Sequence, residues 1–520
     1  MCGIVGYVGK QNASDVLISG LKKLEYRGYD SCGVSTITDG VFSTYKTTKR
    51  IDNLEKLIDN KEKSFIGLGH TRWATHGGAT DNNAHPHHSN SGKFMVVHNG
   101  IIENYLELKE MLSKNGYTFY SETDTEIIPN LIEFYFKGNL LEAVKKATDE
   151  LIGSYALGVM CLDLPNEIVA TKRNSPLIVG VGKDENFIAS DFSAILKYTD
   201  EICTLENNEF AVLYADRVEF YDNNLKKYPK ELKRIDLTNE DTEKNGYNHF
   251  MQKEINENTL TIKNTVSEYL KGEDIKFDFD IPEEVLKKIK HIHIVACGTA
   301  MHAGLNGKNI IEKLTRIPVI VDVASEFRYR DPIIDKDDFA IFISQSGETA
   351  DTIACIELVK SKNVNFLSIV NVKESTIDRM SDNVIYTKAG PEIAVASTKA
   401  YVAHVCAIDL FAIYLADILK SVDSKVLKDL KTELKNIHNA VQIVLEKDEE
   451  YLEYAKTIVN DRDVFYLGRG LDYYVALEGS LKLKEISYIH SEATQFGELK
   501  HGPIALIEEG TNASVICTSE

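Results

Sequence analysis

The sequence lacks features that mark secreted, metal-binding and nucleic-acid-binding proteins. Its eight cysteines form no C-x-x-C pair, which argues against a cysteine metal framework and for reduced thiols in the cytosol. The formal charge of −20 argues against nucleic-acid binding, because phosphate backbones need a basic face. No basic segment followed by an apolar one opens the chain, so no signal peptide and a cytoplasmic location are expected.

Long uninterrupted apolar runs are also missing. The most apolar stretch, residues 402–420, is interrupted by His404, Asp409 and Asp417. A buried helix is therefore expected there rather than a membrane span. What the chain does have is length and an ordinary globular composition, with 520 residues, 43% of them apolar and 27% charged. This length predicts about three domains.

The first part of the chain, to about residue 215, carries short strand patterns in close succession. Residues 3–9, 94–100 and 187–191 read as strands that end at turn residues, and residues 102–116 read as an amphipathic helix. Because long helices do not separate these strands, the pattern favours antiparallel sheets with helices packed on them, an α+β fold. A polar, charged connector is expected from about residue 222 to 285.

After residue 290 the pattern changes to strand, glycine-bearing loop and helix. Residues 291–304, 339–360 and 464–485 each follow it, which predicts parallel α/β layers. The first and third of these units resemble each other and predict a duplicated lobe. The second copy begins near residue 455 and is shorter than a usual domain, so the chain is expected to stop inside that lobe. The predicted domains are residues 1–218, 219–285 as linker and connecting helix, 286–425, 426–453 as connecting helix, and 454–520.

Cys2 follows the initiator methionine directly and precedes an apolar strand. One interpretation is a small buried hydrophobic residue, which is how free cysteine usually behaves. The other is an N-terminal nucleophile. Removal of Met1 would leave an α-amine that can act as the base for the neighbouring thiol.

Three further motifs of the first part suit a site for a free amino acid. Asn99 and Gly100 form either a hairpin turn or a pair of oxyanion donors. Arg72, in "HTRWATHGG", has a planar fork that suits a carboxylate, and Asp124, in "SETDTE", can accept an ammonium group. Each charged residue alone is more often a solvated surface group. Together with Cys2 they describe a pocket for an amino acid whose side chain is attacked.

The motif "SQSGETADT" lies between an expected strand and an expected helix. Its hydroxyls on Ser344, Ser346 and Thr349, with Gly347 for close approach, suit a phosphate at a helix N-terminus. Simple helix capping is the alternative. No G-K-[ST] follows, so ATP is not implied. Two other helix starts add Thr299, Ser397 and Thr398.

Glu478, Lys482 and Glu485 stand at positions i, i+4 and i+7 of an expected helix. This spacing places them on one face. They form either a surface ion-pair stripe or a proton-handling set in which two carboxylates tune a lysine. The loop that follows adds His501.

The motifs "MCGIVGYVG", "LEYRGYDSCG", "HTRWATHG", "NAHPH", "VVHNGIIEN" and "SETDTE" resemble the glutaminase domain of N-terminal-nucleophile amidotransferases. Over essentially the whole chain, the sequence most resembles the isomerizing glutamine–fructose-6-phosphate aminotransferase family, the glucosamine-6-phosphate synthases. The resemblance implies a four-layer N-terminal-nucleophile hydrolase sandwich followed by doubly wound sugar isomerase (SIS) lobes. It implies transfer of the amide nitrogen of L-glutamine to D-fructose 6-phosphate, which gives D-glucosamine 6-phosphate and L-glutamate for amino-sugar synthesis. It also implies no cofactor, no metal and a homodimer.

The resemblance also implies roles for the residues of the first part. Cys2 would attack the glutamine side-chain amide, with Asn99 and Gly100 as the oxyanion hole. Arg72 would bind the substrate carboxylate and Asp124 its amine. Arg27, Thr75 and His76 would line the pocket, and Trp73 would gate the passage of ammonia. A zinc site at His85, His87 and His88 is disfavoured, because a Pro-broken loop lacks the usual ligand spacing and the family uses no metal there.

In the second part the resemblance implies that Glu485 moves protons between C1 and C2 of the sugar, assisted by Lys482. His501 would open the sugar ring from a neighbouring subunit. The residues expected to contact the sugar phosphate are Thr299, Ser344, Gln345, Ser346, Thr349, Val395, Ser397 and Glu478. Many relatives carry Ser where this chain has Ala300, so one ligand contact is expected to be lost.

Three alternatives stay open from the sequence. Family members continue beyond "NASVICTSE" to a tail with a lysine, so this chain is expected to keep at best the glutaminase half-reaction. A phosphoribosylpyrophosphate amidotransferase would share the amidase front, but "SQSGETADT" and the helix of Lys482 argue against it. A non-catalytic sugar-phosphate sensor would need no nucleophile, which the set around Cys2 argues against.

Overall fold

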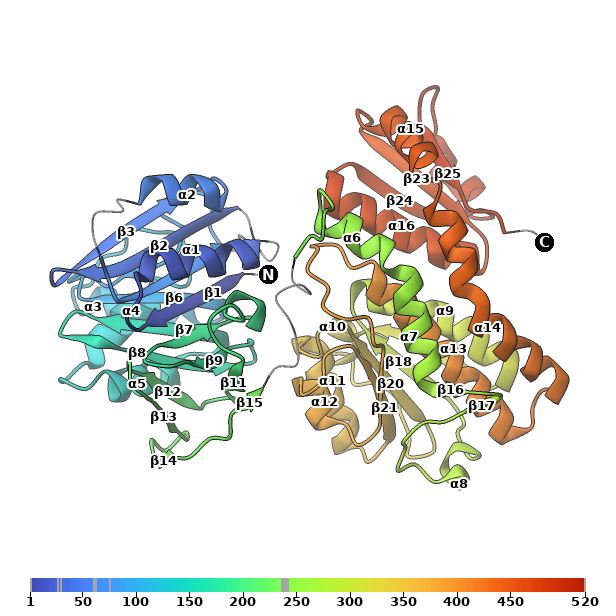
Figure 1. Cartoon of the computed structure of the whole chain (residues 1–520), viewed down its shortest axis with the longest axis horizontal. Coiled ribbons are helices and arrows are strands. Elements are labelled where there is room, and N and C mark those ends of the chain that lie inside the picture. The colour runs from blue at the N-terminus through green and yellow to red at the C-terminus, as the bar shows by residue number, and fades with distance from the viewer. Residues whose placement is uncertain are drawn as a thin grey trace. The chain divides into compact units, whose positions relative to one another are not determined.

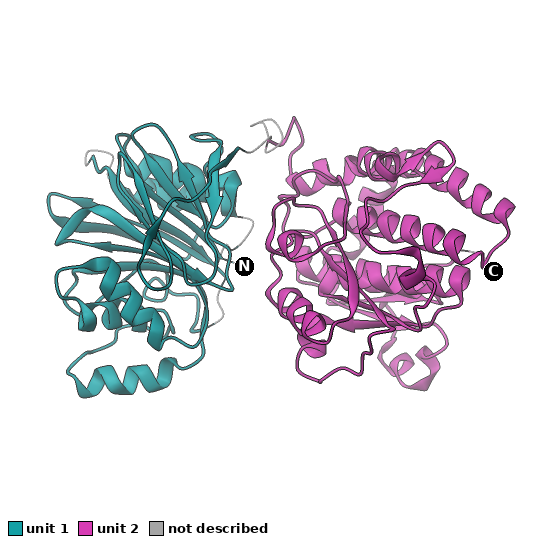
Figure 2. Ribbon diagram, turned by 90° about the horizontal axis from the view of Figure 1, so that it is seen from below, with its two compact units in different colours: residues 1–242 teal, residues 243–520 magenta. Residues whose placement is uncertain are grey.

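The computed structural model describes residues 2–25, 28, 30–58, 63–73, 76–234 and 243–518. The chain divides into two compact units, residues 1–242 (unit 1) and residues 243–520 (unit 2), coloured separately in Figure 2. Each unit has its own sheets and its own core. The finer domain limits expected from the sequence stay a prediction.

Unit 1 is built on two antiparallel sheets, most of whose strands are labelled in Figure 1. Within the described residues, the first sheet has the order β15 (Lys233–Arg234), β11 (Glu201–Thr204), β9 (Ile178–Val181), β10 (Asn186–Ala189), β1 (Gly3–Val8), β4 (Ile66–Arg72), β2 (Ser31–Thr38), β3 (Val41–Thr47). The second has the order β14 (Lys227–Tyr228), β13 (Val218–Tyr221), β12 (Phe210–Leu213), β8 (Leu164–Arg173), β7 (Gly153–Cys161), β6 (Phe94–Ile102), β5 (His87–His88). Its strands therefore continue past residue 218.

The alternation of side chains along β1 explains why the two sheets stack. Ile4 and Val8 point into the core between the sheets, where they meet residues of the second sheet such as Val97. Val5 and Tyr7 point the other way, into the core under the helices α1 (Ala13–Leu24) and α2 (Ile51–Leu57). A strand buried on both faces needs a covering layer on each side.

Helices also cover the outer face of the second sheet. The strands β6, β7, β8 and β12 share one core with three helices: α3 (Tyr105–Lys114), α4 (Ile127–Tyr135) and α5 (Leu140–Glu150). A short 3-10 helix, η2 (Phe192–Ala194), packs on α1. Unit 1 is thus a helix–sheet–sheet–helix sandwich, and the four-layer fold predicted for the first part is confirmed.

Unit 2 contains a parallel sheet in the order β19 (Val319–Val323), β18 (Ile292–Ala296), β20 (Phe339–Ser344), β21 (Asn365–Val370), β22 (Val384–Tyr386). One face of this sheet packs against three helices: α7 (Asn258–Tyr269), α9 (Gly298–Thr315) and α13 (Lys399–Leu419). The other face packs against α10 (Ala324–Phe327), α11 (Ala350–Ser361) and α12 (Thr376–Met380). This doubly wound arrangement confirms the second part of the predicted fold class.

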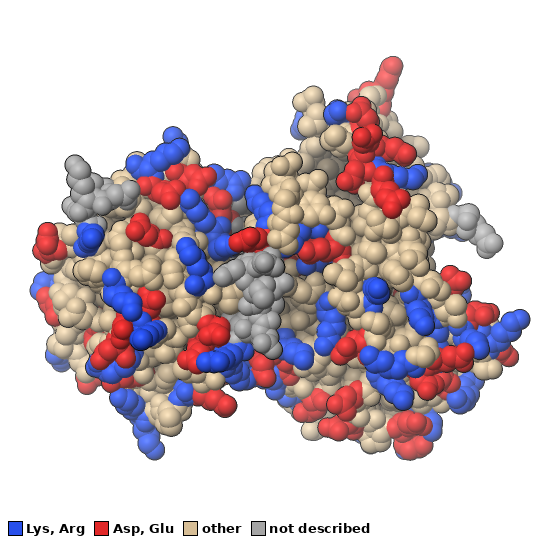
Figure 3. Space-filling model, in the orientation of Figure 1, with Lys and Arg blue, Asp and Glu red and all other residues tan. Residues whose placement is uncertain are grey.

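The rest of unit 2 holds a smaller parallel sheet in the order β24 (His490–Gln495), β23 (Asp463–Gly468), β25 (Asn512–Val515). Its helix α16 (Leu471–Ser487) packs on β23, β24 and α9. Figure 3 shows acidic side chains gathered over α15 (Asp448–Ile458), whose first turn carries three of them. The remaining elements are α6 (Phe250–Asn256), β16 (Leu270–Lys271), β17 (Asp274–Ile275), α8 (Glu283–Leu286), α14 (Ser424–Leu445), η4 (Leu499–His501) and η5 (Pro503–Leu506).

The apolar run at residues 402–420 forms most of α13. Of the helices in the described residues, α13 is the one long and apolar enough to cross a membrane, yet 61% of its most apolar window is buried inside the protein. Phe411 and Leu415 are fully buried in the core shared with α9 and the sheet. The predicted buried helix is therefore what the structure has at this place.

Replacing Phe411 with alanine is expected to destabilise unit 2 by about 3–5 kcal/mol, because it leaves a cavity in the core against α13. Thermal unfolding followed by circular dichroism measures the effect. Ile443→Ala on α14 is the control: its side chain is 62% exposed, so its unfolding temperature should barely move. If both variants lose the same amount of stability, burial of Phe411 on α13 does not stabilise the core of unit 2.

Candidate functional site

Cys2 lies immediately before β1, at the end where β1 pairs with β4. The pairing sets Gly3 opposite Thr71, so Cys2 comes next to the residues that follow Thr71. The Trp73 N–H donates to Cys2 Sγ at 3.3 Å, and the Cys2 thiol lies 3.6 Å from the Trp73 carbonyl oxygen. The side chain is half-buried rather than enclosed in a core. This placement favours the nucleophile over the buried-hydrophobe interpretation.

Asn99 and Gly100 lie on β6, in the other sheet of unit 1. The Asn99 side-chain amide donates to the Cys2 carbonyl oxygen at 3.1 Å, so the amide is beside the thiol-bearing residue. Gly100 has a φ of +138°, and a Cβ built on it would lie 2.0 Å from the Ser154 carbonyl oxygen. Only glycine fits there. The pair is a strand segment with a special backbone rather than a two-residue hairpin turn.

Arg72 and Asp124 approach the same place from two other segments. The buried Arg72 guanidinium donates to the carbonyl oxygens of His76, Gly77 and Gly78. Burial lowers the pKa of Arg72, and the charges of Cys2, Asp124 and Asp30 oppose that change. Asp124 is buried, and its Oδ2 accepts the Ile102 N–H at 2.8 Å at the end of β6. The Arg72 guanidinium therefore interacts electrostatically with both Cys2 and Asp124.

The other residues predicted for the amidase site are placed in part. Trp73 is 38% exposed beside Cys2. His76 meets the Tyr105 ring edge-on, with the ring centres 5.5 Å apart. Arg27 and Thr75 lie outside the described residues.

The residues predicted to bind a sugar phosphate start at the carboxyl ends of β18 and β20. These neighbouring strands pair with Ala296 opposite Ile343, and the chain order reverses between them, because β19 lies on the other side of β18. Ligands of doubly wound sheets bind at such a switch point. Thr299 lies in the first turn of α9 after β18, and Ser344 is the last residue of β20.

The segment from Ser344 to Thr349 is a loop held open by its own hydroxyls. Ser344 Oγ accepts the Gly347 N–H at 3.0 Å and lies 2.9 Å from Thr349 Oγ1, while Ser346 Oγ accepts the Glu348 N–H at 3.2 Å. Gly347 has a φ of +66°, and a Cβ there would lie 1.9 Å from Ser375 Oγ. The loop thus has a fixed shape before α11, the geometry of an anion cradle.

A second loop joins this one through Asn371. The Asn371 N–H donates to the Gln345 carbonyl oxygen at 3.2 Å, and its side chain donates to the Gly390 carbonyl oxygen at 2.7 Å. Beyond Gly390, Glu392 accepts the Ser397 hydroxyl at 2.7 Å. Val395 is 46% exposed at the tip of this loop.

Glu478, Lys482 and Glu485 share one face of α16, as their spacing predicted. Lys482 Nζ lies 3.3 Å from Glu478 Oε1 and 2.7 Å from Glu485 Oε2, and it donates to Thr299 Oγ1 at 2.9 Å. The lysine is mostly buried. The contact with Thr299 brings the α16 face to the first turn of α9, so this is more than a surface ion-pair stripe. His501 lies in η4 with an exposed side chain, and no hydrogen bond or ion pair of the described residues joins it to Lys482.

Comparison with known proteins decides what these two sites belong to. A SIS domain model matches residues 285–414 and 457–520, and a glutamine amidotransferase domain model matches residues 70–197. The chain is 53% identical to the glutamine–fructose-6-phosphate aminotransferase [isomerizing] of Clostridium tetani, over 100% of this chain and 86% of that protein. The chain belongs to the isomerizing glutamine–fructose-6-phosphate aminotransferase family.

Other members of the family agree with this. The Methanosarcina acetivorans aminotransferase is 44% identical over 100% of this chain and 86% of its own length. The solved C-terminal domain of glucosamine-fructose-6-phosphate aminotransferase from Francisella tularensis matches with a TM-score of 0.51 and 42% identity, over 52% of this chain and 77% of that chain. The family predicted from the motifs is thereby confirmed.

Two histidines beside the aminotransferase sites were not found by sequence reasoning. His70 Nε2 lies 2.9 Å from Asn99 Oδ1, and His302 Nδ1 lies 2.7 Å from Glu478 Oε2. A signal existed for each. His70 stands two residues before Arg72 on a strand, and His302 stands three residues after Thr299 on a helix, so each shares a face with a predicted site residue.

The histidines considered for zinc are used by protein hydrogen bonds instead. His87 Nδ1 lies 2.9 Å from the Tyr120 hydroxyl, and its Nε2 lies 3.2 Å from Thr123 Oγ1. His85 Nδ1 accepts the His98 N–H at 3.3 Å. The rings of His85 and His87 belong to a buried row, in which His70 stacks on His85 with ring centres 4.1 Å apart and His85 meets His87 edge-on.

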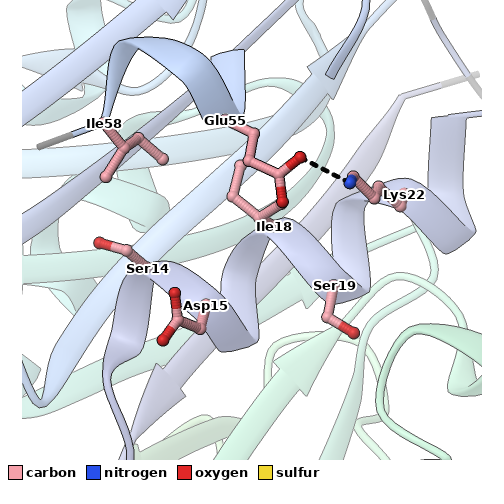
Figure 4. Close-up of a pocket in the computed structure, with 7 residues that line it drawn as sticks. All are labelled: Ser14, Asp15, Ile18, Ser19, Lys22, Glu55 and Ile58. Atoms are coloured by element: carbon pink, nitrogen blue, oxygen red, sulfur yellow. Dashed lines mark hydrogen bonds and ion pairs between the residues drawn. The ribbon is translucent and has the colours of Figure 1, made fainter. Parts of the chain in front are cut away.

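A separate hollow of about 270 Å³ lies between α1 and α2 (Figure 4). Its cation, Lys22, pairs with Glu55 at 2.7 Å and with Asp52 at 3.2 Å. An anionic ligand would therefore have to displace two carboxylates. The lining residues are Ser14, Asp15, Ile18, Ser19, Lys22, Glu55 and Ile58, and none of them is a predicted site residue.

The histidine row predicts that unit 1 loses stability in acid. Burial lowers the pKa of His87 well below 6.5, so the folded protein keeps this ring neutral while the unfolded chain takes up a proton below about pH 6.5. The free energy of unfolding should then fall as the pH falls from about 6.5, by up to about 1.4 kcal/mol per pH unit for each such histidine. His87→Gln should weaken this dependence in thermal unfolding between pH 5 and 7.

The neighbouring His88 gives the matched control, because its side chain is exposed. His88→Gln should leave the pH dependence of the unfolding temperature as it is in the unaltered chain. If His87→Gln and His88→Gln behave alike, burial of the row does not set the acid sensitivity.

Proposed function

We propose that this chain transfers the amide nitrogen of L-glutamine to D-fructose 6-phosphate, with isomerisation to D-glucosamine 6-phosphate and release of L-glutamate. The names of its relatives support this reaction. The observation that carries it is the position of Cys2, whose thiol lies against the Trp73 peptide while the Asn99 amide lies against its backbone. A sensor of sugar phosphates has no use for that arrangement.

In the first half-reaction Cys2 is the nucleophile. Its α-amine, free once Met1 is removed, takes the thiol proton, and sulfur attacks the side-chain amide carbon of glutamine. The carbonyl oxygen becomes an oxyanion that accepts hydrogen bonds from Asn99 Nδ2 and the Gly100 N–H. Arg72 holds the substrate carboxylate and Asp124 its ammonium group.

The intermediate then breaks down in two steps. The proton on the α-amine passes to the leaving nitrogen, the C–N bond breaks, and ammonia departs from a thioester on Cys2. Water then attacks the thioester carbonyl, the C–S bond breaks, and glutamate leaves with the thiol restored. His76, Arg27 and Thr75 line this pocket in the proposal, and Trp73 gates the ammonia that leaves it.

In the second half-reaction the ammonia meets an open-chain sugar phosphate. The loop 344–349 and Thr299 offer hydroxyls and N–H groups at the switch point, which suits a phosphate. Gln345, Val395 and Ser397 border it. Ammonia adds to C2 of the ketose and water leaves to give an imine. Glu485 then moves a proton from C1 to C2, while the proton of the C1 hydroxyl passes to the nitrogen, which yields the amino sugar with an aldehyde at C1.

Lys482 supports this proton transfer. Its ammonium group lies between the carboxylates of Glu478 and Glu485, and it can donate to the atom on C2 that gains charge as the C1 proton leaves, the nitrogen in the imine or the oxygen in the ketose. Glu478 is nearly saturated by Thr299, His302 and Lys482, so in the proposal it holds the lysine in place beside the sugar.

His501 is proposed to act on the sugar ring of a second copy of the chain, which makes the working form a homodimer. Its exposure on η4 supports a role outside its own unit. A cytoplasmic location fits eight described cysteines that are all free.

Cys2→Ala is expected to abolish glutamine hydrolysis, because no other group supplies the sulfur that forms the thioester. Release of glutamate measures this loss. Binding of fructose 6-phosphate, measured by isothermal titration calorimetry, should stay unchanged, because the phosphate site lies in unit 2. A variant that still hydrolyses glutamine at the original rate would contradict the proposed nucleophile, and an unaltered chain without any glutaminase activity would favour a sensor.

Lys482→Met is expected to slow exchange of the C1 proton of fructose 6-phosphate by about 10²-fold or more, the usual contribution of an acid–base group. Proton NMR in D₂O follows this exchange. Glutamine hydrolysis should be unaffected. Lys484→Met on the same helix is the control. Lys484 is exposed and, two residues after Lys482, lies on a different side of the helix. Equal effects of both substitutions would contradict the role of Lys482.

A further inference from the structure

His70 lies fully buried on β4, where it bridges the two sheets of unit 1. Its Nε2 faces two oxygens of β6, the His98 carbonyl at 3.0 Å and Asn99 Oδ1 at 2.9 Å. A backbone carbonyl can only accept a hydrogen bond. Nε2 must therefore carry a hydrogen, and His70 is a donor at this position.

That donor determines how the Asn99 amide is turned. A side-chain amide has an accepting end and a donating end, and the end that faces an N–H has to be the oxygen. If the amide were turned over, two donors would face each other in a buried place, which costs the full desolvation of both groups. Asn99 Nδ2 consequently points the other way, where it lies 3.1 Å from the Cys2 carbonyl oxygen.

The histidines next to His70 form a consistent set of hydrogen bonds of their own, so none of them has to exchange a proton with His70. His85 Nδ1 accepts the His98 N–H at 3.3 Å, so the hydrogen of neutral His85 is on Nε2, 3.4 Å from Thr125 Oγ1. The Thr125 hydroxyl then donates to His98 Nδ1 at 2.8 Å, and His98 Nε2–H faces the Ser154 carbonyl oxygen at 3.4 Å. Each ring has one permitted tautomer.

Charge and burial favour the neutral form of His70. Burial lowers its pKa to about 3, and the charge of Arg72 acts in the same direction. Its other ring nitrogen, Nδ1, is buried and has no hydrogen-bond partner among the described residues, as expected for a lone pair. The ring stacks on His85 with the planes 15° apart.

We propose that His70 is a positioning residue for glutamine hydrolysis: it fixes the Asn99 side chain so that Nδ2 is always presented to the oxyanion formed at Cys2. The role rests on the proposed function, because it acts on the oxyanion of the glutaminase half-reaction. His70 touches neither sulfur nor substrate. Its contribution is to remove the wrong amide orientation before substrate arrives.

The test compares His70→Leu with His70→Gln in the full chain. Leucine removes the donor, so kcat for glutamine hydrolysis should fall by about 10²-fold with little change in KM, as when an oxyanion donor is lost. Glutamine carries an N–H near the position of Nε2 and should restore most of kcat. Alkylation of Cys2 by iodoacetamide forms no oxyanion and should proceed at the same rate in both variants. His88→Leu, which removes an exposed histidine, should change nothing.

Two results would overturn the proposal. One is a His70→Leu variant whose kcat is unchanged, or whose Cys2 alkylation slows as much as its kcat, which would make His70 structural. The other comes from the unaltered protein labelled with ¹⁵N-histidine: the signals of His70, identified by their loss in His70→Gln, should show a protonated Nε2 and a bare Nδ1. A hydrogen on Nδ1 instead of Nε2 would mean that His70 does not donate to Asn99, and this result would contradict the proposal even if the leucine variant fails to fold. An unaltered protein without glutaminase activity would instead overturn the proposed function.

Discussion

The register of β1 against β4 is the constraint on which the amidase site depends. Because Gly3 faces Thr71, Cys2 comes beside the Trp73 peptide, which directly follows Arg72, the last residue of β4. A slip of one residue would turn every side chain of β1 to the opposite face. Ile4 and Val8 would then leave the core between the sheets, so the packing that holds the sandwich together also holds the thiol in place.

The two units place their candidate site residues on different kinds of secondary structure. Unit 1 uses strand ends of two stacked antiparallel sheets, and side chains such as His70 connect one sheet to the other. Unit 2 uses the carboxyl ends of β18 and β20, where hydroxyls and N–H groups meet at a switch in strand order. In the proposed reaction, the nucleophile and the oxyanion donors of unit 1 act on the amide. The loop of unit 2 holds the phosphate, and the lysine between its carboxylates supports the proton transfer.

Much of this could be predicted from the sequence because the motifs are local. The close succession of short strands in the first part and the strand, glycine-bearing loop and helix units after residue 290 predicted the two fold classes. The i, i+4, i+7 spacing predicted the shared face of Lys482 and its carboxylates. Contacts between distant segments could not be predicted. His70 meets Asn99 across 29 residues and His302 meets Glu478 across 176, and only the folded sheets and helices bring them together. The interpretation of Asn99 and Gly100 as a hairpin turn was excluded only by the strand pairing of β6.

The most direct test of the account is covalent labelling of the full chain with 6-diazo-5-oxo-L-norleucine, a glutamine analogue whose carbonyl carbon lies where the amide carbon would be. Peptide mass spectrometry then locates the label. The account predicts one label, on Cys2, that an excess of glutamine prevents, while the exposed Cys517 stays unmodified. Labelling that spreads to Cys517 or that glutamine does not prevent would contradict a glutamine pocket built around the Cys2 thiol.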